Sequence, residues 1–194
     1  MPPIEGRAIR PTPSQPLPRF DARQFRDAMG RFATGVVVIS TEFENAAHAM
    51  TANAFMSGSL EPPLVLVSVA CTARMHQRIR EARVFGISVL TQTQQAISNH
   101  FAGKPMKDGL PAFDRVGGLP VVAGAAVQLA ADLEHDYGCG DHTLFVGRVS
   151  ELRLAPDGPQ PLLFHGGRYA RVAAPDWSAD ALPDGFWTNH EYRW

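Results

Sequence analysis

Short apolar runs bounded by turn residues recur along the chain and predict strands more often than helices. Three such runs, rich in Val, Ile and Leu, span Val36 to Thr41, Leu64 to Ala70 and Val84 to Leu90. A shorter segment from Ala49 to Ala52 predicts another strand. Runs of this length that end at Gly, Pro or polar clusters are typical of buried strands, because β-branched side chains pack well on a pleated surface.

Two longer segments alternate apolar and polar residues, which predicts half-buried antiparallel strands. Their apolar positions are Val127, Leu129, Ala131 and Leu133 in the first and, less strictly, Leu144, Val146 and Val149 in the second. The sequence "GCGDH" between them predicts a tight turn. Gly138 and Gly140 are expected to supply positive φ, and Asp141 is expected to cap the turn. The Gly166-Gly167 pair predicts a later hairpin.

Three segments instead follow the period of a helix. In the first, Asp21 is the expected N-cap and Gly35 the terminator, and the apolar positions are Phe25, Ala28, Met29 and Phe32. In the second, Thr72 is the expected N-cap and the apolar positions are Met75, Ile79 and Ala82. In the third, Thr93 to Phe101, the residues expected to face inward are Ala96, Ile97 and Phe101. The segments predict three short amphipathic helices.

The order of these elements predicts the architecture. Six or seven strands with three helices do not alternate regularly, so a doubly wound parallel sheet is disfavoured and a small, mainly antiparallel β-barrel with peripheral short helices is favoured. Repeated prolines in residues 1–19 predict an N-terminal arm, and the domain is expected over residues 20–172. The three tryptophans in residues 173–194 predict a tail that packs on the barrel or on a partner subunit.

Composition narrows the function. The chain has 194 residues and a formal net charge of −1, which suits one domain and gives no field that attracts nucleic acid or a membrane surface. Neither an export signal nor a membrane-spanning run is visible, so we expect a cytoplasmic protein that acts on small molecules. The two cysteines, Cys71 and Cys139, lie far apart in sequence and are expected to be buried, inert thiols.

Motif searches exclude the common nucleotide cradles and leave one cluster of titratable groups. Its members are His135, Asp136, Cys139, Asp141 and His142. The spacing fits no standard zinc site, and strand alternation would scatter these side chains, so metal is disfavoured. A hydrolase is also disfavoured, since no serine is placed on a strained turn. We therefore interpret this cluster, which lies where a tight turn is predicted, as a turn that also bears a functional His142.

The ordered motifs "FRDAMGRFATGVVVIST", "HAMTANAFMSGSLEPPLVLVSV", "QQAISNHFAG", "GCGDHTLFVGRV" and "PLLFHGGRYARV" together resemble the short-chain flavin reductase family. Its members are reductase components of two-component flavin-dependent monooxygenases. The resemblance implies an FMN-binding split β-barrel, antiparallel and Greek-key-like, that forms a homodimer. It also implies binding of FMN or FAD, hydride transfer from NADH or NADPH, and release of reduced flavin to an oxygenase by diffusion.

The resemblance further implies which residues form the site. The flavin would be bordered by Thr34, Gly35, Val36, Thr51, Ala52 and Asn53, with Ser57 and Ser59 in the following turn. Residues implied near the ribityl and phosphate groups or elsewhere around the flavin are Ser68, Cys71, Thr72, Ser98, Phe101 and Tyr169. The nicotinamide side would comprise Gly140, Asp141 and a catalytic His142. Gly58 departs from the family pattern, in which a β-branched residue is common.

The residue types agree with this interpretation. Isoalloxazine is flat, with apolar faces and a polar rim, so backbone N–H groups, short hydroxyls and an amide suit its edge. Hydride transfer is chemistry of the cofactors and needs positioning more than a protein acid or base. Two alternatives stay open: a protein that binds flavin without turnover, and a pyridoxamine-oxidase-like or haem-handling split barrel.

Overall fold

The computed structural model describes residues 19–107 and 109–173. The expected N-terminal arm and aromatic tail lie almost wholly outside these ranges. The helices are α1 (Ala22–Met29), α2 (Arg74–Ala82) and α3 (Gln95–Phe101), and a 3-10 turn, η1 (Gln92–Gln94), precedes α3. The first six strands are β1 (Thr34–Gly35), β2 (Val37–Phe43), β3 (Ala46–Ala52), β4 (Phe55–Leu60), β5 (Pro63–Ala70) and β6 (Val84–Val89). The other six are β7 (Phe113–Val116), β8 (Leu119–Val122), β9 (Val127–Cys139), β10 (His142–Leu154), β11 (Leu163–His165) and β12 (Arg168–Ala170).

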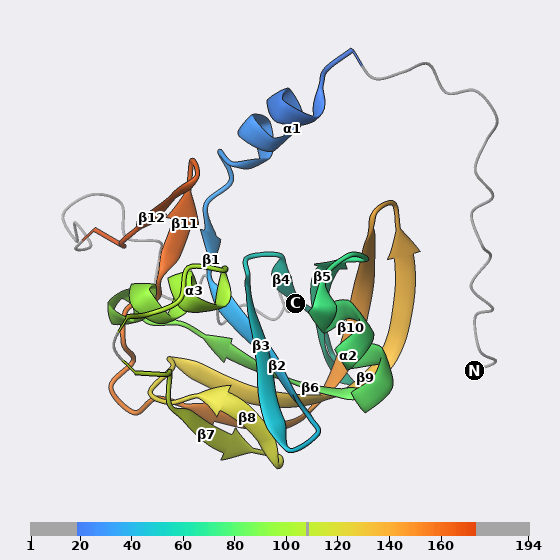
Figure 1. The fold of residues 1–194 in the computed structure, drawn as a ribbon, viewed down its shortest axis with the longest axis vertical. Coiled ribbons are helices and arrows are strands. Elements are labelled where there is room, and N and C mark those ends of the chain that lie inside the picture. Colours follow the sequence, from blue (N-terminus) through green and yellow to red (C-terminus); the bar gives the residue numbers. More distant parts are fainter. Residues whose placement is uncertain (1–18, 108, 174–194) are drawn as a thin grey trace.

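A seven-stranded antiparallel sheet forms the body of the protein (Figure 1). Its strand order is β3-β2-β6-β9-β10-β5-β4, so the two edge strands are consecutive in the sequence. A three-stranded sheet, β1-β11-β12, and the hairpin β7-β8 complete the described β structure. The predicted mainly antiparallel architecture with short helices is confirmed, but the described residues form twelve strands where six or seven were expected. None of the helices in the described ranges has the length and apolar character that a membrane crossing requires.

The core shows why the alternating segments form strands. Leu129, Ala131 and Leu133 on β9 are buried in the main apolar cluster, as predicted. On β10, Val146 is buried as predicted, but Phe145 is buried as well, with no exposed surface, whereas Leu144 is only half-buried. The prediction for Leu144 was therefore wrong by one position. A β-bulge shifts the register at Val146, and such an irregularity obscures a strict two-residue period.

Strand β4 corrects a second prediction. The segment from Ser57 to Ser59, expected as a turn, pairs with β5 and contains a β-bulge between these two serines. Gly58 lies in the bulge, where an added Cβ would overlap the side chain of Leu66. A β-branched residue at this position would therefore require Leu66 to move. Glycine suits position 58 because the side chain of Leu66 on β5 occupies the space that a Cβ would need.

Helix α1 begins as predicted and ends early. Asp21 accepts from the N–H of Gln24 at 2.7 Å, and the Gln24 side chain accepts from the Asp21 N–H at 2.9 Å, which completes a capping box. The helix ends at Gly30, so the prediction of Gly35 as terminator was wrong, and Gly35 instead forms part of β1. No residue of α1 is buried, and the helix stands apart from the sheets in Figure 1.

The other two helices pack on the barrel. Met75 and Ile79 of α2 are buried as predicted, but the N-cap is Ala73 and not Thr72. Ile97 and Phe101 of α3 pack against a second apolar cluster, whereas Ala96 is exposed and was predicted wrongly. The fully buried residue of α3 is Ser98. A hydroxyl at such a position needs hydrogen-bond partners, which the candidate site supplies.

Both cysteines are exposed, so the prediction of buried thiols was wrong. Cys71 follows the last residue of β5, and Cys139 is the last residue of β9. Strand ends reach solvent even where the middle of the strand is buried, and sequence composition does not distinguish these two places.

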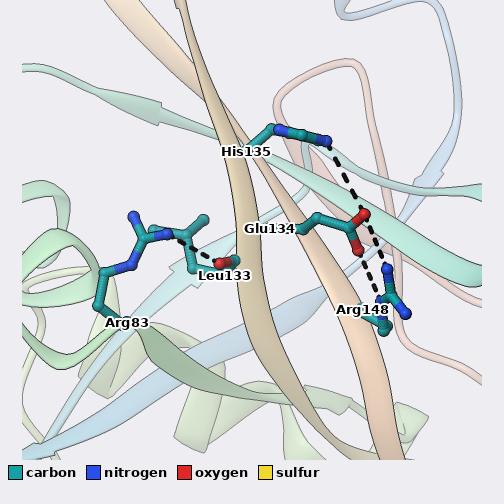
Figure 2. A network of polar contacts seen from close by, with 5 residues as sticks. All are labelled: Arg83, Leu133, Glu134, His135 and Arg148. Carbon is teal, nitrogen blue, oxygen red and sulfur yellow. Dashed lines mark hydrogen bonds and ion pairs between the residues drawn. The ribbon is translucent and has the colours of Figure 1, made fainter. Parts of the chain in front are cut away.

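The long β9–β10 hairpin is braced where its register shifts. Glu134 has no pairing partner on β10, because Leu133 pairs with Gly147 and His135 with Val146. The Glu134 carboxylate accepts from Arg148 Nε at 2.8 Å and from a second guanidinium nitrogen at 3.0 Å, as Figure 2 shows. The hydrogen bond from Arg148 lowers the pKa of Glu134 below its ordinary value. The pair ties the two strands together at the bulge that precedes the hairpin tip.

We expect Glu134→Gln to loosen the hairpin tip without unfolding the barrel. Because the pKa of Glu134 is lowered in the folded state, its stabilising contribution is present above the ordinary value of 4.5 and is lost as pH falls through the folded-state value. Amide hydrogen exchange of residues 135–145 should therefore accelerate in the variant at neutral pH. The exposed Asp157→Asn is the control. Unchanged exchange at the hairpin would contradict the role assigned to Glu134.

Candidate functional site

A small cavity lies between β3, α3 and β12. Its volume is about 160 Å³. Its apolar lining comprises Val36, Ala52, Ala102 and Phe164, and its polar lining comprises Thr51, Asn53, Ser98 and Tyr169. Six of these eight residues were predicted from the sequence, and they come from segments far apart in the chain. Ala102 and Phe164 were not named as site residues: each lies inside a quoted motif, but an apolar residue of this type gives no signal of a site.

Hydroxyl groups connect the elements around this cavity. Thr51 Oγ1 donates to the carbonyl of Ser98 at 2.7 Å, and Ser98 Oγ lies 2.9 Å from the hydroxyl of Tyr169. Tyr169 in turn donates to Asn99 Oδ1 at 3.1 Å, so β3, α3 and β12 are joined by side-chain hydrogen bonds. Such a network fixes the rotamers of the residues that line a site. Asn99 lies in the stretch from Ser98 to Phe101 that the resemblance implies near the ribityl or phosphate groups, but it was not named singly, since its position on a helix is equally typical of a solvated face.

A larger cavity of about 810 Å³ opens beside the first, under α1 and the β11–β12 hairpin. Asn53 and Phe164 line both cavities, so the two spaces adjoin. Thr34, predicted from the sequence, lines the larger one. Its Oγ1 is buried and has no hydrogen-bond partner among the described residues. An orphaned buried hydroxyl of this kind indicates a position that a ligand atom or water satisfies.

The predicted nicotinamide-side residues lie at the tip of the β9–β10 hairpin. Gly140 has a φ of 63°, as predicted, whereas Gly138 does not adopt positive φ and was predicted wrongly. His142 Nδ1 lies 2.7 Å from Asp141 Oδ1. The hydrogen bond with His142 lowers the pKa of Asp141 below its ordinary value. An ionised carboxylate only accepts, so Nδ1 of His142 is the donor to Asp141, and Nε2 is the nitrogen that a neutral imidazole would offer as an acceptor.

One segment predicted near the ribityl and phosphate groups, Ser68 to Thr72, lies beside this tip. Ala70 pairs with His142, and the N–H of Cys71 donates to the carbonyl of Asp141 at 2.9 Å. His76 Nε2 lies 2.8 Å from Thr143 Oγ1, an arrangement that was not predicted. The tertiary structure therefore brings the segment from Ser68 to Thr72 next to the Gly-Asp-His turn.

Other predicted residues do not join either cavity. Ser57 and Ser59 lie on β4 and Ser68 on β5, outside both linings. Phe101 packs against the second apolar cluster and contributes support to the cavity wall. His142 also lies outside both linings. The predicted set thus divides into a cavity group around Thr51 and a hairpin group around His142.

The cavity group suits a flat ligand with a polar edge. Aliphatic and aromatic side chains supply the apolar walls, and three hydroxyls and one amide supply the polar atoms. Among the residues that the structure describes, no charged side chain lines the small cavity. This chemistry fits a conjugated ring that is neutral on its faces and forms hydrogen bonds at its rim, as the isoalloxazine ring of a flavin does.

Comparison with known proteins agrees with this chemistry. A model of the flavin reductase like domain matches residues 29–173. An NADH-dependent flavin reductase from Rhodococcus is 43% identical over 155 residues, which cover 78% of this chain and 87% of that protein. The reductase component of 4-hydroxyphenylacetate 3-monooxygenase from Thermus thermophilus is 39% identical over 151 residues, which cover 78% of this chain and 97% of that protein.

Solved structures show the same relationship. The flavin reductase PheA2 in its native state has a TM-score of 0.77 and 44% identity, covering 80% of this chain and all of that one. An NADH:FAD oxidoreductase from Streptomyces globisporus, solved with NAD and FAD fragments, has a TM-score of 0.73 and 38% identity. The match covers 82% of this chain and 96% of that one. Since the family model spans most of the described barrel and these relatives align along nearly their whole length, the chain belongs to the flavin reductase family.

Proposed function

We propose that this protein oxidises NADH and reduces FMN or FAD, and that the reduced flavin leaves to serve an oxygenase. The observation that supports this most strongly is the uncharged cavity with its hydroxyl and amide rim, in a chain whose relatives are NADH-dependent flavin reductases. Relatives that are reductase components of monooxygenases support the oxygenase partner. Because the relatives are named for NADH, we propose NADH over NADPH.

The residues of the cavity group would hold the flavin. When bound, the flavin supplies an acceptor for the hydride of the nicotinamide. Thr51, Asn53 and Ser98 would donate or accept at the ring edge, and the orphaned Thr34 hydroxyl is available for a further polar atom. Tyr169 would hold α3 in place through Ser98 and Asn99. These side chains need not change protonation, which agrees with a lining whose described residues include no charged group.

We assign His142 to the nicotinamide side as the catalytic residue. The carboxylate of Asp141 fixes the tautomer of the imidazole and limits its rotation. An imidazole fixed in this way presents Nε2 as a defined acceptor, for which the carboxamide N–H of nicotinamide is a suitable donor. Asp141 is therefore a positioning residue. Cys71 anchors the turn through its backbone N–H, so its thiol is not required for this role.

A simple assay tests the proposed function. The purified protein is mixed with NADH in air, and absorbance of NADH is followed with and without added FMN or FAD. We expect rapid loss of NADH that depends on added flavin. A bound flavin that NADH fails to bleach would instead favour the runner-up, a flavin-binding protein without turnover. The uncharged cavity is compatible with both functions, whereas the ordered His142–Asp141 pair favours turnover.

We also propose a homodimer. Large apolar side chains remain exposed on two strands of the main sheet: Met56 and Leu60 on β4, and Leu152 and Leu154 on β10. Leaving such side chains in water is unfavourable, and a second copy would cover them. We expect a mass of twice the monomer in light scattering at micromolar concentration. Leu152→Glu with Leu154→Glu should shift the mass towards the monomer, while the charge control Glu151→Gln should not.

The remaining assignments concern organisation and location. We propose that residues 20–172 act as one domain and that the segments 1–19 and 173–194 are additions to it. We propose a cytoplasmic location, because NADH is regenerated there.

A further inference from the structure

The outer half of the β9–β10 hairpin extends beyond the strand beside it. Strand β6 pairs with β9 only as far as Asp132, so within the described ranges no strand borders residues 133–139 on that side. On the other side of the hairpin, β5 pairs with β10 up to His142. Because the Gly-Asp-His turn lies at the end of this hairpin, the position of the turn depends on what else holds the two strands.

Helix α2 takes the place of the missing strand along β9. His76, Arg80 and Arg83 are spaced four and three positions apart, which is the repeat of one helix face. The N–H of Leu133 donates to the carbonyl of Arg83 at 2.8 Å, and the Arg83 guanidinium donates to the carbonyl of Leu133 at 3.1 Å (Figure 2). Further along β9, Arg80 Nε lies 2.7 Å from Asp136 Oδ2. These contacts fasten β9 to α2.

His76 reaches the second strand of the hairpin. Its Nε2 lies 2.8 Å from Thr143 Oγ1, and its ring packs edge-on against Phe145 with 5.3 Å between the centroids. Thr143 is only 3% exposed, so its hydroxyl needs partners inside the protein. His76 is the nearer of its two side-chain partners, the other being Cys71 Sγ at 3.9 Å. The bond to His76 therefore fixes β10 at the residue that directly follows His142.

Helix α2 is anchored in the core on its other side. Met75 and Ile79 are buried in the main apolar cluster, and the Arg78 guanidinium lies 3.4 Å from the centroid of the Phe43 ring on β2. A helix packed in this way is a fixed support for the strands that it holds, because close-packed interiors resist displacement. No residue of α2 is among the described residues that line the two cavities, so the helix supports the hairpin from outside the flavin cavity.

We propose that α2 positions the turn that bears His142. His76 acts through Thr143 on β10. Arg80 acts through Asp136 on β9. The proposal rests on the proposed function and on the role assigned to His142. Both are positioning residues: they contact neither cofactor and determine where the imidazole lies relative to the flavin cavity, as groups that support a site from behind do. Their loss affects the use of NADH and not the binding of flavin.

The proposal is tested in two backgrounds, the wild type and His142→Ala. The variants are His76→Ala, Thr143→Val and Arg80→Gln in the full chain. Anaerobic stopped-flow spectroscopy gives the rate of flavin reduction at several NADH concentrations, and flavin fluorescence gives flavin affinity. Arg74→Gln is the matched control, since this exposed arginine lies on the same helix and has no hydrogen bond or ion pair to the hairpin among the described residues. Circular dichroism and the melting temperature check folding.

In the wild-type background, each of the three variants should lower the ratio of the reduction rate to the KM for NADH about 3- to 10-fold. Flavin affinity should change less than about twofold. His76→Gln, which keeps an amide near the position of Nε2, should recover most of the loss. In the His142→Ala background, the same three changes should lower the ratio less than about 1.5-fold, because the imidazole through which they act is already absent.

A merely structural effect would not depend on His142. Equal losses in both backgrounds, or an equal loss in Arg74→Gln, would therefore overturn the proposal. Amide hydrogen exchange of residues 137–143 supplies a readout that does not need activity, and it should accelerate in Thr143→Val. Unchanged exchange there would also overturn the proposal.

The failure of this proposal differs from the failure of the proposed function. If the wild type does not reduce flavin with NADH, the proposed function fails and this proposal with it. If the wild type does so and His142→Ala is slow, but the α2 variants reduce flavin at the wild-type rate, this proposal alone fails. If His142→Ala is as fast as the wild type, the role of the histidine and the proposal built on it both fail.

Discussion

Gly147→Ala is expected to lower the free energy of unfolding by about 2–3 kcal/mol. Gly147 is buried on β10, where an added Cβ would lie 2.5 Å from Phe85 Cζ and 2.9 Å from Ala131 Cβ. Phe85 is itself fully buried, so its ring has no open space into which it can move. The melting temperature should fall by about 5–10 °C for a chain of this size.

Gly138→Ala provides the matched control for this prediction. Gly138 lies on the partner strand β9, where an added Cβ meets no atom within 4 Å and φ is not positive. We expect its unfolding free energy to stay within about 0.5 kcal/mol of the wild type. Chemical denaturation with both variants checks the pair. Equal stability of Gly147→Ala and Gly138→Ala would show that the strands β6, β9 and β10 are not packed as described.

His142→Ala should slow the reduction of flavin by NADH about 10- to 100-fold while leaving flavin affinity within about threefold of the wild type. His142 lies at the hairpin tip, outside the cavity that would hold the flavin ring. If His142 has the proposed role, removing its imidazole should disturb alignment of the nicotinamide and leave the flavin pocket unchanged. Anaerobic stopped-flow spectroscopy at saturating NADH measures the rate, and flavin fluorescence measures the affinity.

Two further variants make the His142 result specific. Asp141→Asn should lower the same rate by a smaller factor, since the asparagine no longer enforces one tautomer of His142. His135→Ala, an exposed histidine on the same hairpin, should have no effect on the rate. If His142→Ala reduced flavin as fast as the wild type with an unchanged KM for NADH, the histidine would have only a structural role in the turn.

Several features of this fold follow from local sequence alone. Strand β9 was predictable because Leu129, Ala131 and Leu133 recur at every second position, although Gln128 and Ala130 between them are buried as well. The start of α1 was predictable because a capping box needs only Asp21 and Gln24, three positions apart. The failures have a common cause, since Leu144, Ala96 and the bulge at Gly58 depend on what packs against them.

In the candidate site, too, some features follow from local sequence and others depend on long-range packing. The sequence by itself determined the residue types, namely short hydroxyls, an amide and the Gly-Asp-His turn, because the order of these motifs identifies the family. Only the tertiary structure placed Phe164 in the cavity with Thr51, Asn99 against Tyr169, and Cys71 beside Asp141. It also showed that α1 leaves its apolar and basic side chains at the edge of a large cavity. Periodicity reports which face of an element is apolar, whereas the long-range packing of elements decides which residues meet.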